Sequence, residues 1–205
     1  MKIGLYYRVL IKDKEGKTVK RTHWKESKSF VLQFLGLFDA HFSHAAGVFA
    51  AAVTVKDTAG ASRSMAATNY ANAYGANLWA AFAPNSNDTY GIQVGTGTTA
   101  PTNIDYKLET KISTGVGAGN LSYGTHSKTT TQVVGSNVDF VFSRSFYNGS
   151  GNTVTVNEIG IVVYNVDSGN PGAAAYILLA RDVITPVDVA NAQTLTVQYT
   201  FRTTV

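Results

Sequence analysis

The sequence predicts a mainly β protein: an antiparallel β-sandwich with an N-terminal β-hairpin and one amphipathic α-helix. Three observations support this fold class. From residue 121 onward, short runs of alternating apolar and polar residues are separated by turn signals such as Gly135-Ser136-Asn137. Charged residues are only 15% of the 205 residues, against about 25% in an ordinary soluble domain. A helical period is convincing only in residues 29–45.

Two β-branched and aromatic runs, residues 3–11 and 18–24, predict the N-terminal hairpin, with its turn at Asp13-Lys14-Glu15-Gly16. Residues 1–28 carry nine Lys or Arg and three Asp or Glu, a net charge of +6, whereas the rest of the chain carries −2. This basic segment either solvates the hairpin and protects a strand edge, or binds an acidic partner. An acidic protein surface fits it better than a nucleic acid, which would require more Arg and interleaved aromatic residues.

Residues 29–45 predict an amphipathic helix capped by Ser27 or Ser29. Its apolar arc carries four Phe, and Gln33 lies outside that arc. Such a face packs either on the chain's own sheet or partly between subunits. The apolar Leu32, which lies off the arc, favours burial between subunits. The predicted arc comprises Phe30, Val31, Phe34, Leu35, Leu37, Phe38, His41, Phe42 and Ala45.

The remaining elements follow from local composition. Residues 48–56 and 61–68 predict a second hairpin, residues 69–87 a long loop, residues 90–94 a short strand and residues 106–112 an extended segment. Later strands are expected at residues 121–134, 138–147, 153–165, 174–183 and 194–204. We expect one composite domain over residues 1–205. Residues 1–46 would form an assembly arm and residues 47–205 the sandwich, with an internal boundary allowed near residues 113–120.

No pattern in the sequence predicts catalysis or a cofactor. Cysteine is absent, which excludes thiol nucleophiles and cysteine metal sites. The letters of Gly95-Thr-Gly-Thr-Thr-Ala100 match a dinucleotide fingerprint, but Pro101 follows where that fingerprint needs a helix, so we expect a turn. Asp39, His41 and His44 do not share one helix face, unlike metal ligands four residues apart. We therefore expect no enzyme activity, no cofactor and no metal site.

Isolated charged residues in the apolar strands are better explained as structural. Arg144, Glu158 and Arg181 lie in such strands, where they either face solvent or pair, and an Arg–carboxylate pair would fix the strand register. Glu109 and Asp182 could join Glu158 as carboxylates for glycoside cleavage, but nothing singles them out.

We expect neither a targeting segment nor a membrane segment in this chain. Lys2, Arg8 and Lys12 interrupt the N-terminus, so no apolar signal-peptide core is present. The longest uncharged stretch, residues 64–87, is too polar for a membrane span. We expect synthesis in a cytoplasm and no membrane partner.

Several segments resemble patterns in uncharacterised virion structural proteins of tailed phages and related head-tailed viruses. They are residues 24–35 (WKESKSFVLQFL), 91–102 (GIQVGTGTTAPT), 105–110 (DYKLET), 145–148 (SFYN), 156–160 (VNEIG), 179–182 (LARD) and 193–197 (QTLTV). The resemblance is scattered over most of the chain and implies a virus structural role. It carries no catalytic residue.

With this resemblance, we expect a capsid decoration or cement protein that stabilises the head lattice by many weak contacts. Its expected location is the virion. Its expected partners are copies of itself, as a trimer or higher homo-oligomer, and other virion proteins such as a major capsid protein. The hairpin could add its edge strand to a neighbour's sheet. The candidate assembly contacts are Tyr6, Arg8, Lys12, Lys14, Lys17, Lys20, Trp24, Phe30, Leu32, Phe34, Phe38 and Phe42.

Three alternative functions remain open at this point, and the last of them is an enzyme, which would need a polar cleft with shifted titrations. The first is a tail, collar or fibre component of the same kind of particle. The second is a carbohydrate-binding module at the host surface, in which Tyr70, Tyr74, Trp79 and Tyr90 would stack on sugar rings.

Overall fold

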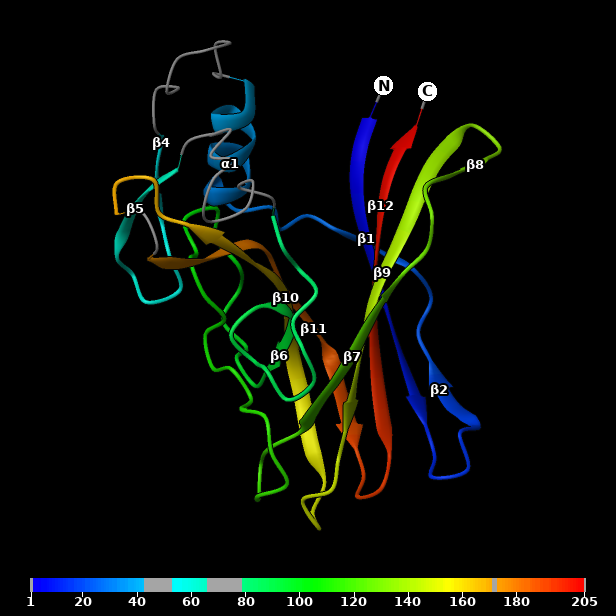
Figure 1. Ribbon diagram of the computed structural model, residues 1–205. Coiled ribbons are helices and arrows are strands. Elements are labelled where there is room, and N and C mark those ends of the chain that lie inside the picture. Colours follow the sequence, from blue (N-terminus) through cyan, green and yellow to red (C-terminus); the bar gives the residue numbers. More distant parts are fainter. Residues whose placement is uncertain (1, 43–52, 66–78, 171–172, 205) are drawn as a thin grey trace.

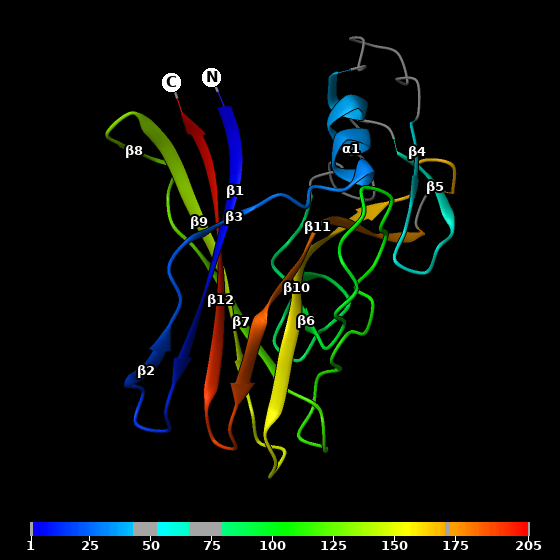
Figure 2. The same ribbon diagram turned by 180° about the vertical axis from the view of Figure 1, so that it is seen from behind.

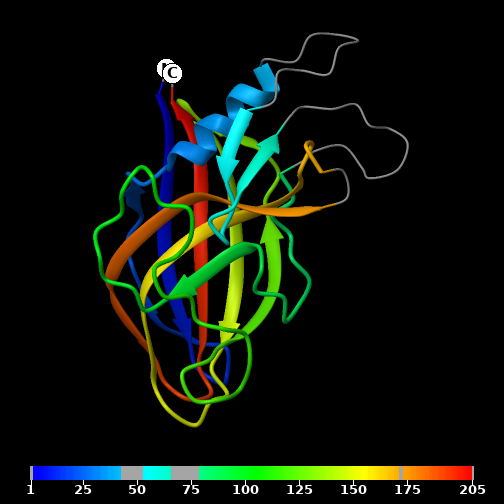
Figure 3. The same ribbon diagram turned by 90° about the vertical axis from the view of Figure 1, so that its left-hand side faces the viewer.

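The computed structural model describes residues 2–42, 53–65, 79–170 and 173–204. These residues form a mainly β protein with antiparallel sheets and one helix, α1 (Leu32–Phe42), which confirms the predicted fold class. Two sheets form the layers of a sandwich, and α1 lies at one end of them (Figure 1). Figure 3 shows the smaller sheet crossing in front of the larger one.

The larger sheet, sheet A, has seven strands. They are β1 (Lys2–Lys12), β2 (Thr18–Arg21), β3 (Lys25–Ser27), β7 (Ser122–Lys128), β8 (Gln132–Val134), β9 (Asn137–Tyr147) and β12 (Thr194–Thr204). Their order is β2-β1-β12-β9-β7, with β3 also beside β1 and β8 beside β9. The smaller sheet, sheet B, contains β6 (Gly91–Gly95), β10 (Val154–Val166) and β11 (Ala174–Val189), in the order β11-β10-β6. The strands β4 (Val53–Lys56) and β5 (Ser62–Met65) form a separate hairpin.

The two ends of the described chain lie side by side in the middle of sheet A (Figures 1 and 2). Strands β1 and β12 pair antiparallel from Lys2 opposite Thr204 to Lys12 opposite Thr194. On its other side β1 pairs with β2 and β3. The predicted hairpin is therefore present, with β2 at the edge of sheet A and β1 between β12 on one side and β2 and β3 on the other.

The hydrophobic core fills the space between sheets A and B. Alternate residues of β1, such as Leu5 and Val9, belong to the same buried cluster as Val197 of β12 and Ile161 of β10. Strand alternation predicts this inward face, because successive side chains point to opposite sides of a sheet. Strand β1, the first part of the predicted assembly arm, thus contributes to the sandwich core.

Most predicted strands agree with the structure to within a few residues, and three differ. The stretch 121–134 is two strands, β7 and β8, and the extended segment 106–112 forms only an isolated bridge between Lys111 and Gly95. Strand β11 continues to Val189. Around the allowed boundary at residues 113–120, a bridge joins Thr114 to Leu121, and Leu121 is in the core. Predictions for residues 43–52 and 66–78 lie outside the described residues.

The helix begins later than predicted because the residues before it join sheet B instead. Phe30 forms an isolated bridge with Ala180, and the amide of Val31 donates to the carbonyl oxygen of Leu179. Ser27 and Ser29 are not caps, since both hydrogen-bond the buried carboxylate of Asp182. The predicted extension to residue 45 lies outside the described residues.

The apolar arc of the helix is also rotated from the predicted one. Gln33, predicted to lie outside the arc, is buried and donates its side-chain amide to the carbonyl oxygen of Asp105. Leu35, predicted inside it, is 62% exposed. The reason is that α1 packs against both β4 and β11. Its buried side chains are those that contact either strand, and they do not form a single apolar stripe.

A buried ion pair joins the two long strands of sheet B. The guanidinium Nε of Arg181 donates to Glu158 Oε2 at 2.8 Å, and both side chains are almost fully buried. This pair confirms the expected Arg–carboxylate contact. Arg144 is stabilised differently, by backbone groups in place of a carboxylate. Its guanidinium donates to five backbone carbonyl groups, including those of Asn87 and Tyr90. Burial lowers the pKa of Arg144 to about 10.

The same ion pair holds the loop after β6 against sheet B. Glu158 accepts hydrogen bonds from the backbone amides of Gly97, Glu109 and Thr110. Arg181 reaches the carboxylates of Asp105 and Glu109 and the carbonyl oxygen of Thr99. Loop and strands are therefore joined by a charged cluster whose hydrogen-bonding groups are paired.

This cluster explains the two glycines of the Gly95-Thr-Gly97 sequence. A Cβ atom at Gly95 would lie 2.5 Å from Glu158 Oε1, and one at Gly97 would lie 2.6 Å from the same atom. No helix follows these residues, so the segment is a turn, as expected. Its glycines allow close approach of a carboxylate of the chain itself and not of a nucleotide phosphate.

The loop in turn positions the start of α1. The amide of Leu32 donates to the carbonyl oxygen of Asn103 at 2.7 Å, and Gln33 donates to the carbonyl oxygen of Asp105. Asp105 thus links Arg181, through its side chain, to the helix, through its carbonyl group. The ion pair in sheet B therefore determines where the first turn of α1 lies.

We expect the substitution Glu158→Gln to destabilise the protein by about 3 kcal/mol, because it leaves Arg181 buried without its fully buried partner. Urea unfolding followed by circular dichroism measures this loss. Asp188→Asn is the matched control: Asp188 lies on β11, is exposed and bonds Thr155, and should change the free energy of unfolding by less than about 0.5 kcal/mol. Equal stability of the two variants would contradict the role given to the ion pair.

Candidate functional site

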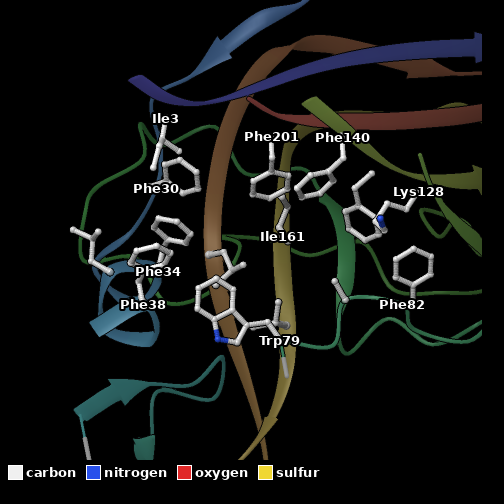
Figure 4. Close-up of a pocket in the computed structure, with 15 residues that line it drawn as sticks. Ile3, Phe30, Phe34, Phe38, Trp79, Phe82, Lys128, Phe140, Ile161 and Phe201 are labelled. Carbon is white, nitrogen blue, oxygen red and sulfur yellow. The ribbon is translucent and has the colours of Figure 1, made fainter. Parts of the chain in front are cut away.

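An open cleft of about 720 Å³ lies at the end of the sandwich where sheet A and sheet B diverge (Figure 4). One wall is sheet A, with Ile3, Phe140, Phe142 and Phe201. The opposite wall is α1 and the residues before it, and the floor is formed by β10 and β11. Lys128 is the only charged residue among the described residues that line this cleft. We call this site the aromatic cleft.

The helix side of the aromatic cleft is a cluster of packed rings. Phe30 stacks on Phe34 with ring centroids 4.1 Å apart, and Phe34 contacts the edge of Trp79 at 5.9 Å. Phe38 lies 6.0 Å from Phe34 and 6.3 Å from Trp79. The distances of 5.9, 6.0 and 6.3 Å lie in the range in which aromatic pairs attract each other beyond their buried area, and the rings of Phe30 and Phe34 are closer still. The rings therefore hold one another in place as a preformed wall.

A second set of rings forms the sheet side. Phe140 of β9 stacks on Phe201 of β12 at 4.8 Å. The imidazole ring of His126 stacks on Phe142 at 5.1 Å, and Phe82 packs against both of these rings. Both walls are therefore aromatic, although their residues come from distant parts of the sequence.

The mouth of the aromatic cleft leaves large apolar side chains in contact with water. Ile3 is 55% exposed, Leu35 62%, Phe38 40% and Phe82 51%. Burial of apolar surface releases about 25 cal/mol per Å², so a partner that covers these side chains gains binding free energy. Contiguous exposed apolar surface on a soluble protein marks an interaction site.

The predicted assembly contacts separate into three groups. Phe30, Phe34 and Phe38 line the aromatic cleft. Leu32 lies on the same helix, is 59% exposed and does not line it. The side chain of Phe42 lies outside the described residues. The second group, at the opposite end of the sandwich (Figure 1), consists of the exposed hairpin residues Lys12, Lys14, Lys17 and Lys20.

The third group lies on the outer face of sheet A. Tyr6 and Arg8 alternate with the core residues of β1, so they point away from sheet B. The guanidinium of Arg8 lies 4.4 Å from the centre of the Trp24 ring, and Arg202 lies 5.2 Å from that of Tyr6. The candidate residues thus do not form one continuous surface.

Sequence reasoning missed the sheet side of the aromatic cleft. Phe201 falls on the inward face of the alternating strand 194–202, and Phe140 and Phe142 are spaced two apart, so their inward direction was readable. Nothing in the sequence indicates that sheets A and B diverge at the level of these rings and leave them lining an open cleft.

The carboxylates considered for catalysis are engaged in structural contacts. Glu109 and Glu158 bind Arg181. Asp182 is buried and accepts hydrogen bonds from Ser27 and from the Tyr199 hydroxyl, and burial raises its pKa. In the described part of the chain, no group of three or more His, Asp or Glu residues could hold a metal ion. Asp39 is exposed, whereas the side chain of His41 and all of His44 lie outside the described residues.

The two described aromatic residues proposed for sugar stacking, Trp79 and Tyr90, lie in different clusters. Trp79 lines the aromatic cleft. Tyr90 packs with Tyr164 and Tyr176 in a different cluster on sheet B. Tyr70 and Tyr74 lie outside the described residues.

No described helix is long and apolar enough to cross a membrane.

Comparison with protein-family models, curated proteins and solved structures found no match to this chain.

His126 makes the cleft side of sheet A sensitive to acid. Its Nε2 accepts a hydrogen bond from the amide of Ile92 at 3.2 Å, which requires the neutral ring. Burial, together with the nearby Arg144, lowers the pKa of His126 to about 4. In the unfolded chain a histidine titrates near 6.5, so the unfolded state takes up the proton first as the pH falls.

We therefore expect the contribution of His126 to stability to be complete above about pH 6.5 and to be lost between pH 6.5 and about 4. Between pH 7 and 5.5 the wild type should lose about 0.5–1 kcal/mol more than His126→Gln, once solvent screening of this partly exposed ring is included. Urea unfolding at the two pH values measures the difference. The exposed His23, changed to Gln, is the control and should behave as wild type; a pH dependence unaltered in His126→Gln would refute the assignment.

Proposed function

We propose that this chain is a non-enzymatic structural protein of a tailed-virus particle, and that it decorates the head lattice through protein–protein contacts. The observation that carries the proposal is the aromatic cleft, whose preformed walls and exposed apolar rim fit a protein surface. A hydrophilic substrate would find one charged side chain, Lys128, among the described residues that line it.

The outer face of sheet A supports a second contact region. Arg, Trp and Tyr dominate the residues that contribute most to binding at protein interfaces. Arg8 and Trp24 are packed together on this face, and Tyr6 and Arg202 form a similar pair. A decoration protein needs several separate contacts, because binding at many points makes individually weak contacts collectively tight.

The sequence resemblance supports the assignment to a virus. Four of the segments that resemble virion proteins meet at the Arg181–Glu158 pair, namely residues 91–102, 105–110, 156–160 and 179–182. The residues shared in these segments build the loop and the two strands that place α1. The resemblance is therefore consistent with a scaffold that this chain shares with those virion proteins, and it does not require a shared active site.

The test is to add the purified chain to tailed-virus particles that lack it and to image them by electron microscopy. We expect regular density over the head. Density confined to the collar, tail tube or fibres would instead support the tail alternative, and a chain that binds no part of the particle would refute both.

Trp24→Ala should weaken particle binding about tenfold or more, because it removes a large ring packed under Arg8 on the proposed contact face. Co-sedimentation of the chain with particles measures the affinity. Val116→Ala is the control: Val116 is 66% exposed in the loop before β7 and should leave binding unchanged. Equal binding of both variants would remove the outer face of sheet A from the proposal.

A further inference from the structure

We propose that the aromatic cleft of one copy of this chain receives the β8–β9 hairpin tip of a second copy. The hairpin tip is defined as residues 133–136, Val-Val-Gly-Ser. This inference rests on the proposed assembly role and deepens it by naming the partner of the cleft.

The aromatic cleft restricts the chemistry of its occupant. Its volume of about 720 Å³ lies in the range of sites that enclose a compact group. Among the described lining residues the one cation, Lys128, already lies 5.5 Å from the centre of the Phe140 ring and donates to the carbonyl oxygen of Thr129. A charged group buried among these rings would lose its hydration without a new ion partner. The occupant should therefore be apolar and uncharged.

The hairpin tip meets this requirement. Val133 is 75% exposed and Val134 is 49% exposed, so two adjacent apolar side chains project into water. Residues 129–138 contain no charged side chain. By contrast, the β1–β2 turn carries Asp13, Lys14 and Glu15, and these charges exclude it from an apolar cleft.

The hairpin tip is held away from the cleft of its own chain. Val134 pairs with Asn137 on one side, and Asn137 pairs with Thr204 of β12 on the other. The guanidinium of Arg202 binds both carboxylate oxygens of Asp139, which fixes the next pair of the ladder. Figures 1 and 2 show the tip on the far side of the chain ends from α1. Because these pairs fix its direction, the tip can reach an aromatic cleft only in another copy.

The experiment uses two variants of the full chain, each altered at an exposed position. The tip variant carries Val133→Asp and Val134→Asp, and the cleft variant carries Leu35→Glu at the rim of the aromatic cleft. Sedimentation velocity over a range of concentrations measures self-association, and circular dichroism confirms that each variant is folded. We expect the wild type to associate and each variant to associate at least about tenfold more weakly.

Mixing the two variants is the decisive step. The intact tip of the cleft variant can enter the intact cleft of the tip variant, so an equimolar mixture should form heterodimers at concentrations at which each variant alone stays monomeric. Two matched controls, Val19→Asp on an exposed strand and Val116→Glu in the exposed loop before β7, should associate as wild type.

Three results would overturn the inference: a monomeric wild type, a mixture that stays monomeric, or controls that lose association as the variants do. A monomeric wild type whose cleft binds a small apolar dye would mean that the cleft takes a small molecule. Particle binding is measured separately. A monomer that decorates heads refutes this inference alone, and an associating chain that binds no particle refutes the proposed function alone.

Discussion

The position of α1, and with it the aromatic cleft, depends on the buried ion pair between Arg181 and Glu158. Glu158 accepts three amides from the loop after β6, and Arg181 holds the same loop through Asp105 and Glu109. The loop then accepts hydrogen bonds from Leu32 and Gln33 at the start of the helix. A buried pair of this kind contributes little net free energy, but loss of one member is costly, so its value here is to select one arrangement of loop and helix.

Helix α1, held in this way, lies across the aromatic cleft from sheet A. Sheets A and B share one core over most of their length and then diverge, and rings from both sides line the gap. At the mouth of this gap Leu35 and Phe82 remain largely exposed. A partner that buries these exposed side chains would gain the free energy of apolar burial. The fold therefore provides a surface that can serve assembly.

Periodicity in the sequence predicts the strands well and the helix less well. Strands β9, β10 and β12 agree closely with the predicted bounds because alternating side chains report the two faces of a sheet, whereas β11 runs beyond its predicted end to Val189. The helix start was misplaced because Phe30 and Val31 pair with β11, a contact 150 residues away that local pattern does not reveal. The prediction of which helix face is buried was wrong for the same kind of reason. Gln33 is buried because its side-chain amide donates a hydrogen bond to the carbonyl oxygen of Asp105, in a distant loop.

The sequence by itself determined the fold class, the hairpin at the N-terminus and the turn at Gly95–Gly97, and it favoured an Arg–carboxylate pair within the apolar strands. These follow from local chemistry: alternation, turn residues and the cost of an unpaired buried charge. Only the tertiary structure decided that β1 lies inside sheet A, that the candidate contacts occupy three separate surfaces, and that Phe140, Phe201 and Phe34 face one cleft. The physical reason is that the angle between two packed sheets arises from contacts between residues far apart in the chain, and no local pattern encodes where such sheets part.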